Sequence, residues 1–333
     1  MEAIWEAESG AVSRLQEIGG WSAPPFSALF ANGFDLLYLV AVPLLLWCVS
    51  TGWGTRLSLL LTGGSLVNGL LKTALHAPRP SWYTLRVSPL VPGTTFGAPA
   101  GAAQGAVTLL GYVGLKTDRR WARPAAAALI VLVALAGVHL GAAFFSGTLL
   151  GLVVGAVLLW LVLRYEAALL RWWRARPLRT QIACALALSL AVPVTAAVWQ
   201  AVVWGGWTAP RGWTGTVPPD AATATLQHVF VLGGALFGLL AGFSLLAARG
   251  WYSAEGSLVS RASRYVTGST GILLILVLHV LVPVPGGAAG LLVSYVLHAL
   301  LSLWIAFGAP ELFVRTRLAD RPLRAEAGEP VPH

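Results

Sequence analysis

The stretch Lys72-Thr73-Ala74-Leu75-His76-Ala77-Pro78-Arg79-Pro80 lies where a long apolar run meets polar chain. A lysine and an arginine at the end of a membrane span most often extend along the lipid to reach water. The spacing of these two cations, with a proline directly after the second, argues for more than that. The apolar run before this stretch decides the fold prediction, because similar apolar runs recur along the chain and each is a candidate membrane span.

Hydrophobic residues make up 57% of the 333-residue chain and charged residues only 11%. Several runs reach the ~20 apolar residues needed to cross about 30 Å of hydrocarbon. We therefore expect an all-α polytopic membrane protein, a helical bundle of about nine transmembrane spans. The predicted spans are residues 34–50, 56–76, 100–115, 124–142, 146–163, 180–203, 226–248, 265–283 and 288–309.

An N-terminal interfacial helix is predicted within residues 1–25, where apolar residues recur at helical spacing. These residues are Ile4, Ala11, Val12, Leu15 and Ile18. A soluble capping helix is the alternative. The Arg-rich stretch 164–179 then separates a five-span core, residues 26–165, from residues 166–333, a four-span extension with a cytoplasmic tail.

The net charge of +9 does not indicate a nucleic-acid partner, because the cations lie in short loops between apolar runs. One set of loops holds 17 of the 22 lysines and arginines, and the other set holds Arg14, Lys72, Arg79, Arg86 and Arg211. Loops rich in lysine and arginine face the cytoplasm. The N-terminus and the 72–97 segment are therefore expected outside, and the C-terminus in the cytoplasm.

Other residues predict packing and anchoring rather than chemistry. Cys48 and Cys184 lack the spacing of a metal site or a disulfide framework, and we expect no metal or cofactor. The pairs Gly151/Gly155 and Gly234/Gly238 would let helices approach closely. Ten tryptophans near span ends are interpreted as interface anchors, not as a ligand cage: Trp21, Trp53, Trp82, Trp121, Trp172, Trp173, Trp204, Trp207, Trp213 and Trp251.

Lysine, six residues, then arginine and proline resembles the first motif of the type 2 phosphatidic acid phosphatase superfamily. In that family the two cations hold phosphate oxygens at the outer end of a helix. The arrangement is physically sensible, because a guanidinium and an ammonium group together offset a dianion that would be costly near lipid. The resemblance implies that Lys72 and Arg79 bind phosphate.

Two further segments keep the outline of the family's other motifs without their reactive side chains. The second motif, Pro-Ser-Gly-His, is similar to residues 99–102, which read Pro-Ala-Gly-Ala. The third motif, Ser-Arg, five residues, His, three residues and Asp, is similar to residues 136–147. The vacated positions are therefore Ala100, Ala102, Ala136, Gly137, Ala143 and Gly147.

In the family, the third-motif histidine attacks phosphorus, its aspartate orients it, and the second-motif histidine protonates the leaving group. Alanine and glycine cannot act as nucleophile, general acid or charge clamp. We therefore predict no catalytic residue in this chain. His139 and His76 lack an acidic partner that would fix the imidazole for attack, and the expected pocket consists of His76, Pro99, Gly101, Gln104 and His139.

Three functions fit these observations. The first is a pseudoenzyme that binds or handles an anionic phospholipid or isoprenoid phosphate at the outer leaflet. The second is an active lipid phosphatase with non-standard residues, and the third is a lipid transporter or flippase. The vacated positions favour the first, whether they arose by drift or by replacement in an active parent.

The resemblance covers about residues 25–165. The last four spans resemble a C-terminal extension of some bacterial members, which implies a bacterial plasma membrane. Phosphate-bearing membrane lipids are the expected partners, and the sequence identifies no protein partner.

The predicted orientation can be tested with cysteines at two loops in a background without Cys48 and Cys184. Ser88→Cys should react with a membrane-impermeant maleimide in intact cells, whereas Asp118→Cys should react only after the cells are opened. The reverse labelling pattern would contradict the orientation.

Overall fold

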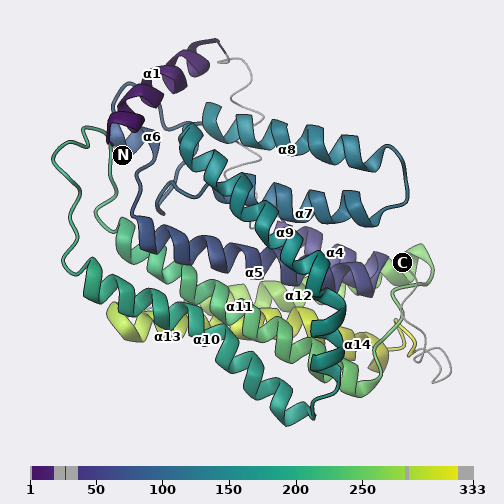
Figure 1. The fold of residues 1–333 in the computed structure, drawn as a ribbon. Coiled ribbons are helices and arrows are strands. Elements are labelled where there is room, and N and C mark those ends of the chain that lie inside the picture. The colour runs from purple at the N-terminus through teal and green to yellow at the C-terminus, as the bar shows by residue number, and fades with distance from the viewer. Residues whose placement is uncertain (1, 19–26, 28–36, 282–284, 322–333) are drawn as a thin grey trace. The chain divides into compact units, whose positions relative to one another are not determined.

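The computed structural model describes residues 2–18, 27, 37–281 and 285–321 (Figure 1). Within these ranges every regular element is a helix, which confirms the all-α fold. The elements are α1 (Glu2–Ile18), η2 (Leu37–Ala41), α4 (Val42–Leu44), η3 (Leu45–Val49), α5 (Thr51–Leu75), α6 (Pro80–Tyr83), α7 (Gly101–Lys116), α8 (Ala122–His139), α9 (Phe145–Arg174), α10 (Leu178–Val203), α11 (Ala221–Arg249), α12 (Leu258–Leu281), α13 (Gly287–Leu303), η4 (Trp304–Gly308) and α14 (Ala309–Arg315).

Six helical segments in the described ranges are long and apolar enough to cross a membrane, which makes the chain a polytopic membrane protein. They are α8 to α12 and the continuous segment Gly287–Arg315. The other predicted spans coincide with the shorter apolar segment Leu37–Val49, with α5 and with the 16-residue α7. Nine crossings therefore stay a prediction. Residues 34–36, 282 and 283 of the predicted spans lie outside the described residues, as do Trp21 and the tail from residue 322.

Contacts divide the chain into two compact units. The first comprises Met1–Gly33, Gly64–Ala167 and Val194–Val229. In this unit α7 and α8 lie side by side (Figure 1). Helix α9 approaches the start of α7 through Gly151 and Gly155: an added Cβ would lie 2.5 Å from the carbonyl oxygen of Ala100 and 2.7 Å from that of Gln104, respectively. The predicted close approach at this glycine pair is confirmed.

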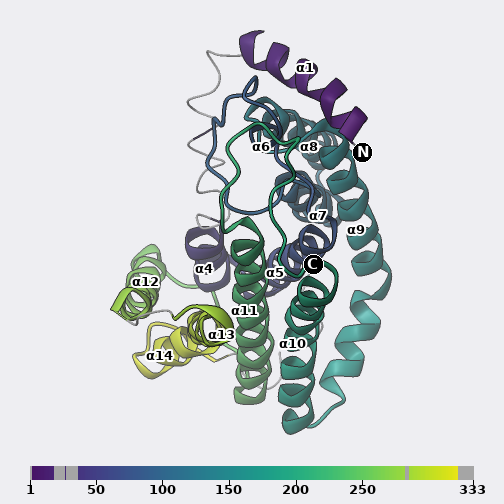
Figure 2. The ribbon, with the colours of Figure 1, turned by 90° about the vertical axis from the view of Figure 1, so that its left-hand side faces the viewer.

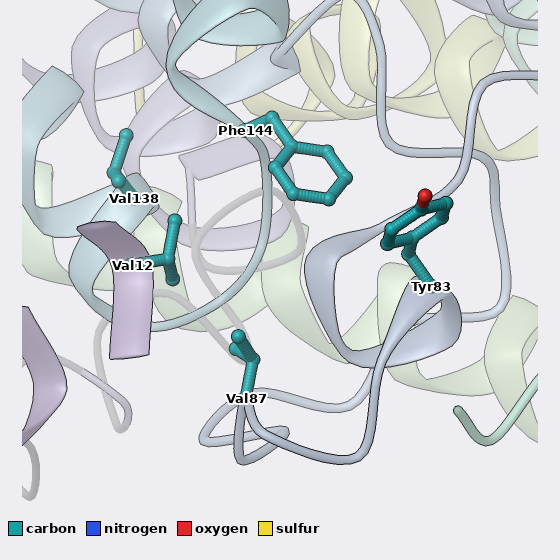
Figure 3. Packing of buried hydrophobic residues seen from close by; sticks show 5 residues of the cluster. All are labelled: Val12, Tyr83, Val87, Val138 and Phe144. Atoms are coloured by element: carbon teal, nitrogen blue, oxygen red, sulfur yellow. The ribbon is translucent and has the colours of Figure 1, made fainter. Parts of the chain in front are cut away.

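Helix α1 packs against α6 and α8 in the first unit. Figure 3 shows Val12 of α1 among Tyr83, Val87, Val138 and Phe144, and all five side chains are buried. The helix is confirmed, and its apolar residues differ in burial. Val12 and Leu15 pack inward, whereas Ile4 and Ile18 are 53% and 80% exposed.

A carboxylate joins α1 to the first turn of α9. The backbone N–H and the hydroxyl of Ser146 donate to the two carboxylate oxygens of Glu8, each over 3.0 Å. A negative charge at a helix N-terminus is stabilised by the unpaired N–H groups and the helix dipole. Helix α1 therefore caps this end of the unit. Its position in a membrane interface stays a prediction.

The second unit comprises Phe34–Gly63, Ala168–Pro193 and Phe230–His333. Helix α12 lies beside α13 and α14, which follow one another in the continuous segment Gly287–Arg315 (Figure 2). Trp47 is fully buried and donates from Nε1 to the carbonyl oxygen of Ile305 over 3.0 Å. Gly234 and Gly238 lie against the backbone of Tyr295 and Ala299, where an added Cβ would collide, so the second glycine pair also permits close packing as predicted. The sequence-based division at residue 165 stays a prediction.

The contribution of the close contact between α7 and α9 to stability can be measured with two glycine-to-alanine substitutions. Gly151→Ala places a methyl group against backbone and should lower stability by about 1–3 kcal/mol. Gly105→Ala should not, because nothing lies within 4 Å of its added Cβ. Thermal unfolding in detergent should separate the two variants, and equal melting temperatures would contradict the packing argument.

Candidate functional site

The end of α5 is shaped by His76. The backbone N–H of His76 donates to the carbonyl oxygen of Lys72 over 3.1 Å, and His76 has φ 48°. A left-handed residue directly after a helix ends it and redirects the chain. The chain after His76 is then held by a later part of the same loop region, because the N–H of Gly97 donates to the carbonyl oxygen of Ala77 over 2.9 Å. A side chain at Gly97 would collide with Pro78.

This backbone arrangement brings Lys72 and Arg79 together on Thr95. Lys72 Nζ donates to Thr95 Oγ1 over 3.2 Å, and Arg79 Nη2 donates to the same oxygen over 3.3 Å. Arg79 Nε also donates to the carbonyl oxygen of Thr95 over 2.8 Å. The guanidinium lies against Gly93 and has its central carbon 5.9 Å from the ring centre of Trp82. Lys72 and Arg79, the cationic pair, are therefore neighbours.

The cationic pair has no counter-charge among the described residues. Both side chains belong to half-buried residues, and neither forms an ion pair with a carboxylate in the described part of the chain. Burial lowers the pKa of Arg79 to about 10, so its guanidinium remains charged at neutral pH. Partly buried charges are normally paired, since desolvation is costly. Two neighbouring cations without an acid therefore form a favourable environment for an anion.

The second motif is fixed by a buried amide network. Asn68 Nδ2 donates to the carbonyl oxygen of Pro99 over 3.1 Å and to Gln104 Oε1 over 2.8 Å. Gln104 Nε2 donates in turn to the carbonyl oxygen of Gly64 over 2.6 Å. These bonds hold the start of α7 against α5. No side chain caps α7, and residues 101 and 102 at its N-terminus are exposed.

The second and third motifs meet at the vacated positions. The N–H of Ala100 donates to the carbonyl oxygen of Gly147 over 2.9 Å. Ala100 and Ala143 belong to one buried cluster with Ala103 and Ala134. A Cβ added at Gly147 would lie 3.9 Å from the Cβ of Ala143. Ala136 and Gly137 are buried at the end of α8. Small side chains therefore pack together at these positions, and their assignment as vacated catalytic positions stays a prediction.

Both histidines of the expected pocket are buried against other parts of the first unit. His139 is buried, its Nδ1 lies 3.2 Å from the carbonyl oxygen of Leu15, and its own carbonyl oxygen accepts a 3.0 Å hydrogen bond from Gln16. His139 is therefore held by α1. His76 is 3% exposed, and its ring lies between Phe96 and Trp204, at centroid distances of 4.2 and 4.4 Å.

An aromatic cluster next to the cationic pair was not predicted. Trp82 is 3% exposed and packs with Phe96, Trp207 and Trp213, so its interpretation as an interface anchor is wrong. Trp121 and Trp172, by contrast, are 68% and 45% exposed, as an anchor would be. Close packing of aromatic rings beside the first motif explains the difference.

The segment after α10 reaches the first motif in the same unit. The N–H groups of residues 214, 215 and 216 donate to the carbonyl oxygens of residues 83, 82 and 81 over 3.0–3.1 Å. Gly215 permits this approach, because any side chain there would collide with Ser81. No periodic pattern in the sequence predicts this pairing. Asn68 could have been identified from the sequence because it is a polar side chain within an apolar span. Thr95 lies in a polar loop, where a threonine is ordinary, so the sequence does not single it out.

Two family models match the chain. Residues 53–171 match the PAP2 superfamily, that is, the type 2 phosphatidic acid phosphatase superfamily, and residues 230–321 match the PAP2 superfamily phosphatase, transmembrane extension. The chain belongs to the PAP2 superfamily. No curated protein and no solved structure matches it significantly. The PAP2 match contains all three motif segments, and the extension match covers most of α11 to α14.

Within residues 2–18, 27, 37–281 and 285–321 of this PAP2 protein, no three histidine, cysteine or acidic side chains lie close enough together to hold a metal ion. At this site Lys72 and Arg79 supply hydrogen-bond donors and positive charge.

The amide network should be essential to the site's rigidity. Asn68→Ala removes the donor of both Pro99 and Gln104, and a buried polar group left without its partner costs about 1–3 kcal/mol. Ser65→Ala, on the same helix and without such bonds, should be nearly neutral. Thermal unfolding of the purified variants measures the difference, and a neutral Asn68→Ala would show that the network is dispensable.

Proposed function

We propose that this PAP2 superfamily protein binds or handles an anionic phospholipid or an isoprenoid phosphate at the outer leaflet without hydrolysing it. The observation that carries the proposal is the cationic pair, which meets at one threonine and has no carboxylate partner among the described residues. A phosphate group supplies the missing negative charge, and its oxygens accept from ammonium and guanidinium donors.

Thr95 supports the proposal because it already holds the donors in place. Its hydroxyl oxygen accepts from Lys72 and Arg79 at once. A phosphate oxygen arriving beside Thr95 would use the remaining N–H donors of the same two side chains, since an ammonium carries three and a guanidinium five. Little side-chain reorganisation is then needed for binding, which favours affinity.

The absence of hydrolysis is proposed from the residues at positions 100, 102, 137, 143 and 147. Each is alanine or glycine, and neither residue can attack phosphorus, transfer a proton or hold charge. His76 and His139, the nearest substitutes in sequence, are occupied by aromatic packing and by α1. Binding without turnover, in a sensor, carrier or scaffold, therefore fits the site better than catalysis.

Binding can be measured in nanodiscs that contain either phosphatidic acid or phosphatidylcholine. Lys72→Ala and Arg79→Ala should each weaken phosphatidic acid binding roughly tenfold, because a hydrogen bond to a charged group contributes about 1.5–3 kcal/mol. Arg211→Ala is the matched control, since Arg211 is an exposed arginine predicted on the same face of the membrane. Equal loss in all three variants would indicate nonspecific charge attraction and overturn the proposal.

Thr95 allows a finer test. Thr95→Ala should weaken phosphatidic acid binding, since both cations lose a shared acceptor, whereas Thr94→Ala at the exposed neighbouring position should not. If Thr95→Ala bound as tightly as the unaltered protein, Thr95 would not position the pair.

Hydrolysis is tested by phosphate release from phosphatidic acid and isoprenoid diphosphate. The unaltered protein should stay at background, and the combined variant Ala100→Ser, Ala102→His, Gly137→Arg, Ala143→His and Gly147→Asp should gain turnover if it folds. Release by the unaltered protein that disappears in Arg79→Ala would instead establish an active phosphatase. Movement of lipid between leaflets of sealed vesicles would favour the transporter alternative.

A further inference from the structure

An apolar groove lies in the second unit, far along the chain from the cationic pair. It has a volume of about 310 Å³ and is lined by Ile275, Leu300, Leu303, Trp304, Phe307 and Gly308. Its walls come from α12, α13 and the π-helix η4, which lie in the segments long and apolar enough to cross a membrane. Single-turn π-helices inside longer helices are frequent at functional positions.

The groove keeps its shape because Trp304 is held at one side. Trp304 Nε1 donates to the carbonyl oxygen of Gly268 over 2.9 Å. Gly271 and Gly308 lie so close to the indole that an added Cβ at either would press into the ring. The indole therefore has little room to move. A groove bounded by such a fixed ring can accept a flexible apolar chain without a large ordering cost in the protein.

A cluster of arginines adjoins the groove at Phe307. The guanidinium carbon of Arg249 lies 5.9 Å from the centre of the Phe307 ring. Arg249, Arg315 and Arg321 all donate to the carboxylate of Glu311, over 3.2, 3.2 and 2.8 Å. The basic cluster, Arg249, Arg315 and Arg321 around Glu311, therefore carries three positive charges and one negative charge.

The basic cluster retains capacity for a ligand. Within the described ranges Arg249 and Arg315 each donate one hydrogen bond, although a guanidinium has five N–H donors. The side chains of Arg249 and Arg315 are 52% and 68% exposed, whereas that of Glu311 is 12% exposed. The largely buried carboxylate of Glu311 therefore binds the arginines on one side, while the rest of the Arg249 and Arg315 side chains is exposed.

We propose that the groove and the basic cluster together form a binding site for an anionic glycerophospholipid in the predicted cytoplasmic leaflet. One acyl chain lies in the groove, and the phosphate is bound by Arg249 and its neighbours. Apolar helices of a membrane protein are surrounded by lipid, and basic pockets at the ends of such helices bind anionic head groups. Guanidinium groups are suited to phosphate because they donate two parallel hydrogen bonds. This site is separate from the proposed outer site and does not depend on it.

The site is tested by native mass spectrometry of the full chain with added phosphatidylglycerol or phosphatidylcholine of identical acyl chains. The unaltered protein should retain phosphatidylglycerol preferentially. Arg249→Gln and Arg315→Gln should each reduce its affinity about fivefold, the effect expected for one basic residue near a membrane surface. Arg171→Gln, at an exposed arginine in the same unit and predicted on the same side, is the matched control.

The groove is tested separately from the charge. Leu300→Trp adds a large ring at an exposed position on the groove and should reduce phosphatidylglycerol retention, whereas Leu292→Trp, on the same helix and also exposed but outside the groove, should not. Both positions are exposed, so folding should be preserved, and thermal unfolding verifies it. Unchanged retention in Leu300→Trp, or equal retention of the two lipids, would overturn the site. Lys72→Ala with Arg79→Ala should leave this binding intact, which separates it from the outer site.

Discussion

Lys72 and Arg79 donate to a single hydroxyl oxygen in the first unit. Repulsion between Lys72 and Arg79 would drive them apart in a flexible loop, yet the surrounding backbone holds both against Thr95. His76 ends α5 in a left-handed conformation, Gly97 bonds to Ala77, and Gly93 leaves space for the guanidinium. The rest of this unit can be understood as the framework that keeps this unfavourable pair together. Keeping such a pair together costs free energy, and this cost is the physical ground for proposing an anion as its ligand.

Small residues have two different roles in the molecule. At Gly151, Gly155, Gly234 and Gly238 they let backbones approach, and a larger residue would separate the helices. At Ala100, Ala143 and Gly147, the positions that the motif resemblance marks as vacated, they form tight packing. The contact between Ala100 and Gly147 is made by main-chain atoms, so it does not depend on which side chains these two positions carry.

The helical fold and the three motif segments could be predicted because they depend on local patterns. Apolar length predicts helices, and motif spacing predicts which segments belong together. The burial of His76 and Trp82 could not be predicted, since it depends on the chain from Trp204 to Thr216 returning to the first motif, a contact between residues more than 120 positions apart. Thr95 was missed for a related reason. A threonine in a loop is ordinary in sequence, and only its two cationic neighbours in space distinguish it.

The inward face of α1 was also only partly predictable. Amphipathic spacing indicated a helix, but Ile4 and Ile18 are exposed while Glu8 points at the start of α9. That arrangement has a consequence for how any ligand is held. The N–H groups at the beginning of a helix are usual places for a phosphate, and at α9 Glu8 already accepts from Ser146. An incoming anion would therefore meet the chain's own carboxylate at the start of α9, whereas the start of α7 has no side-chain cap.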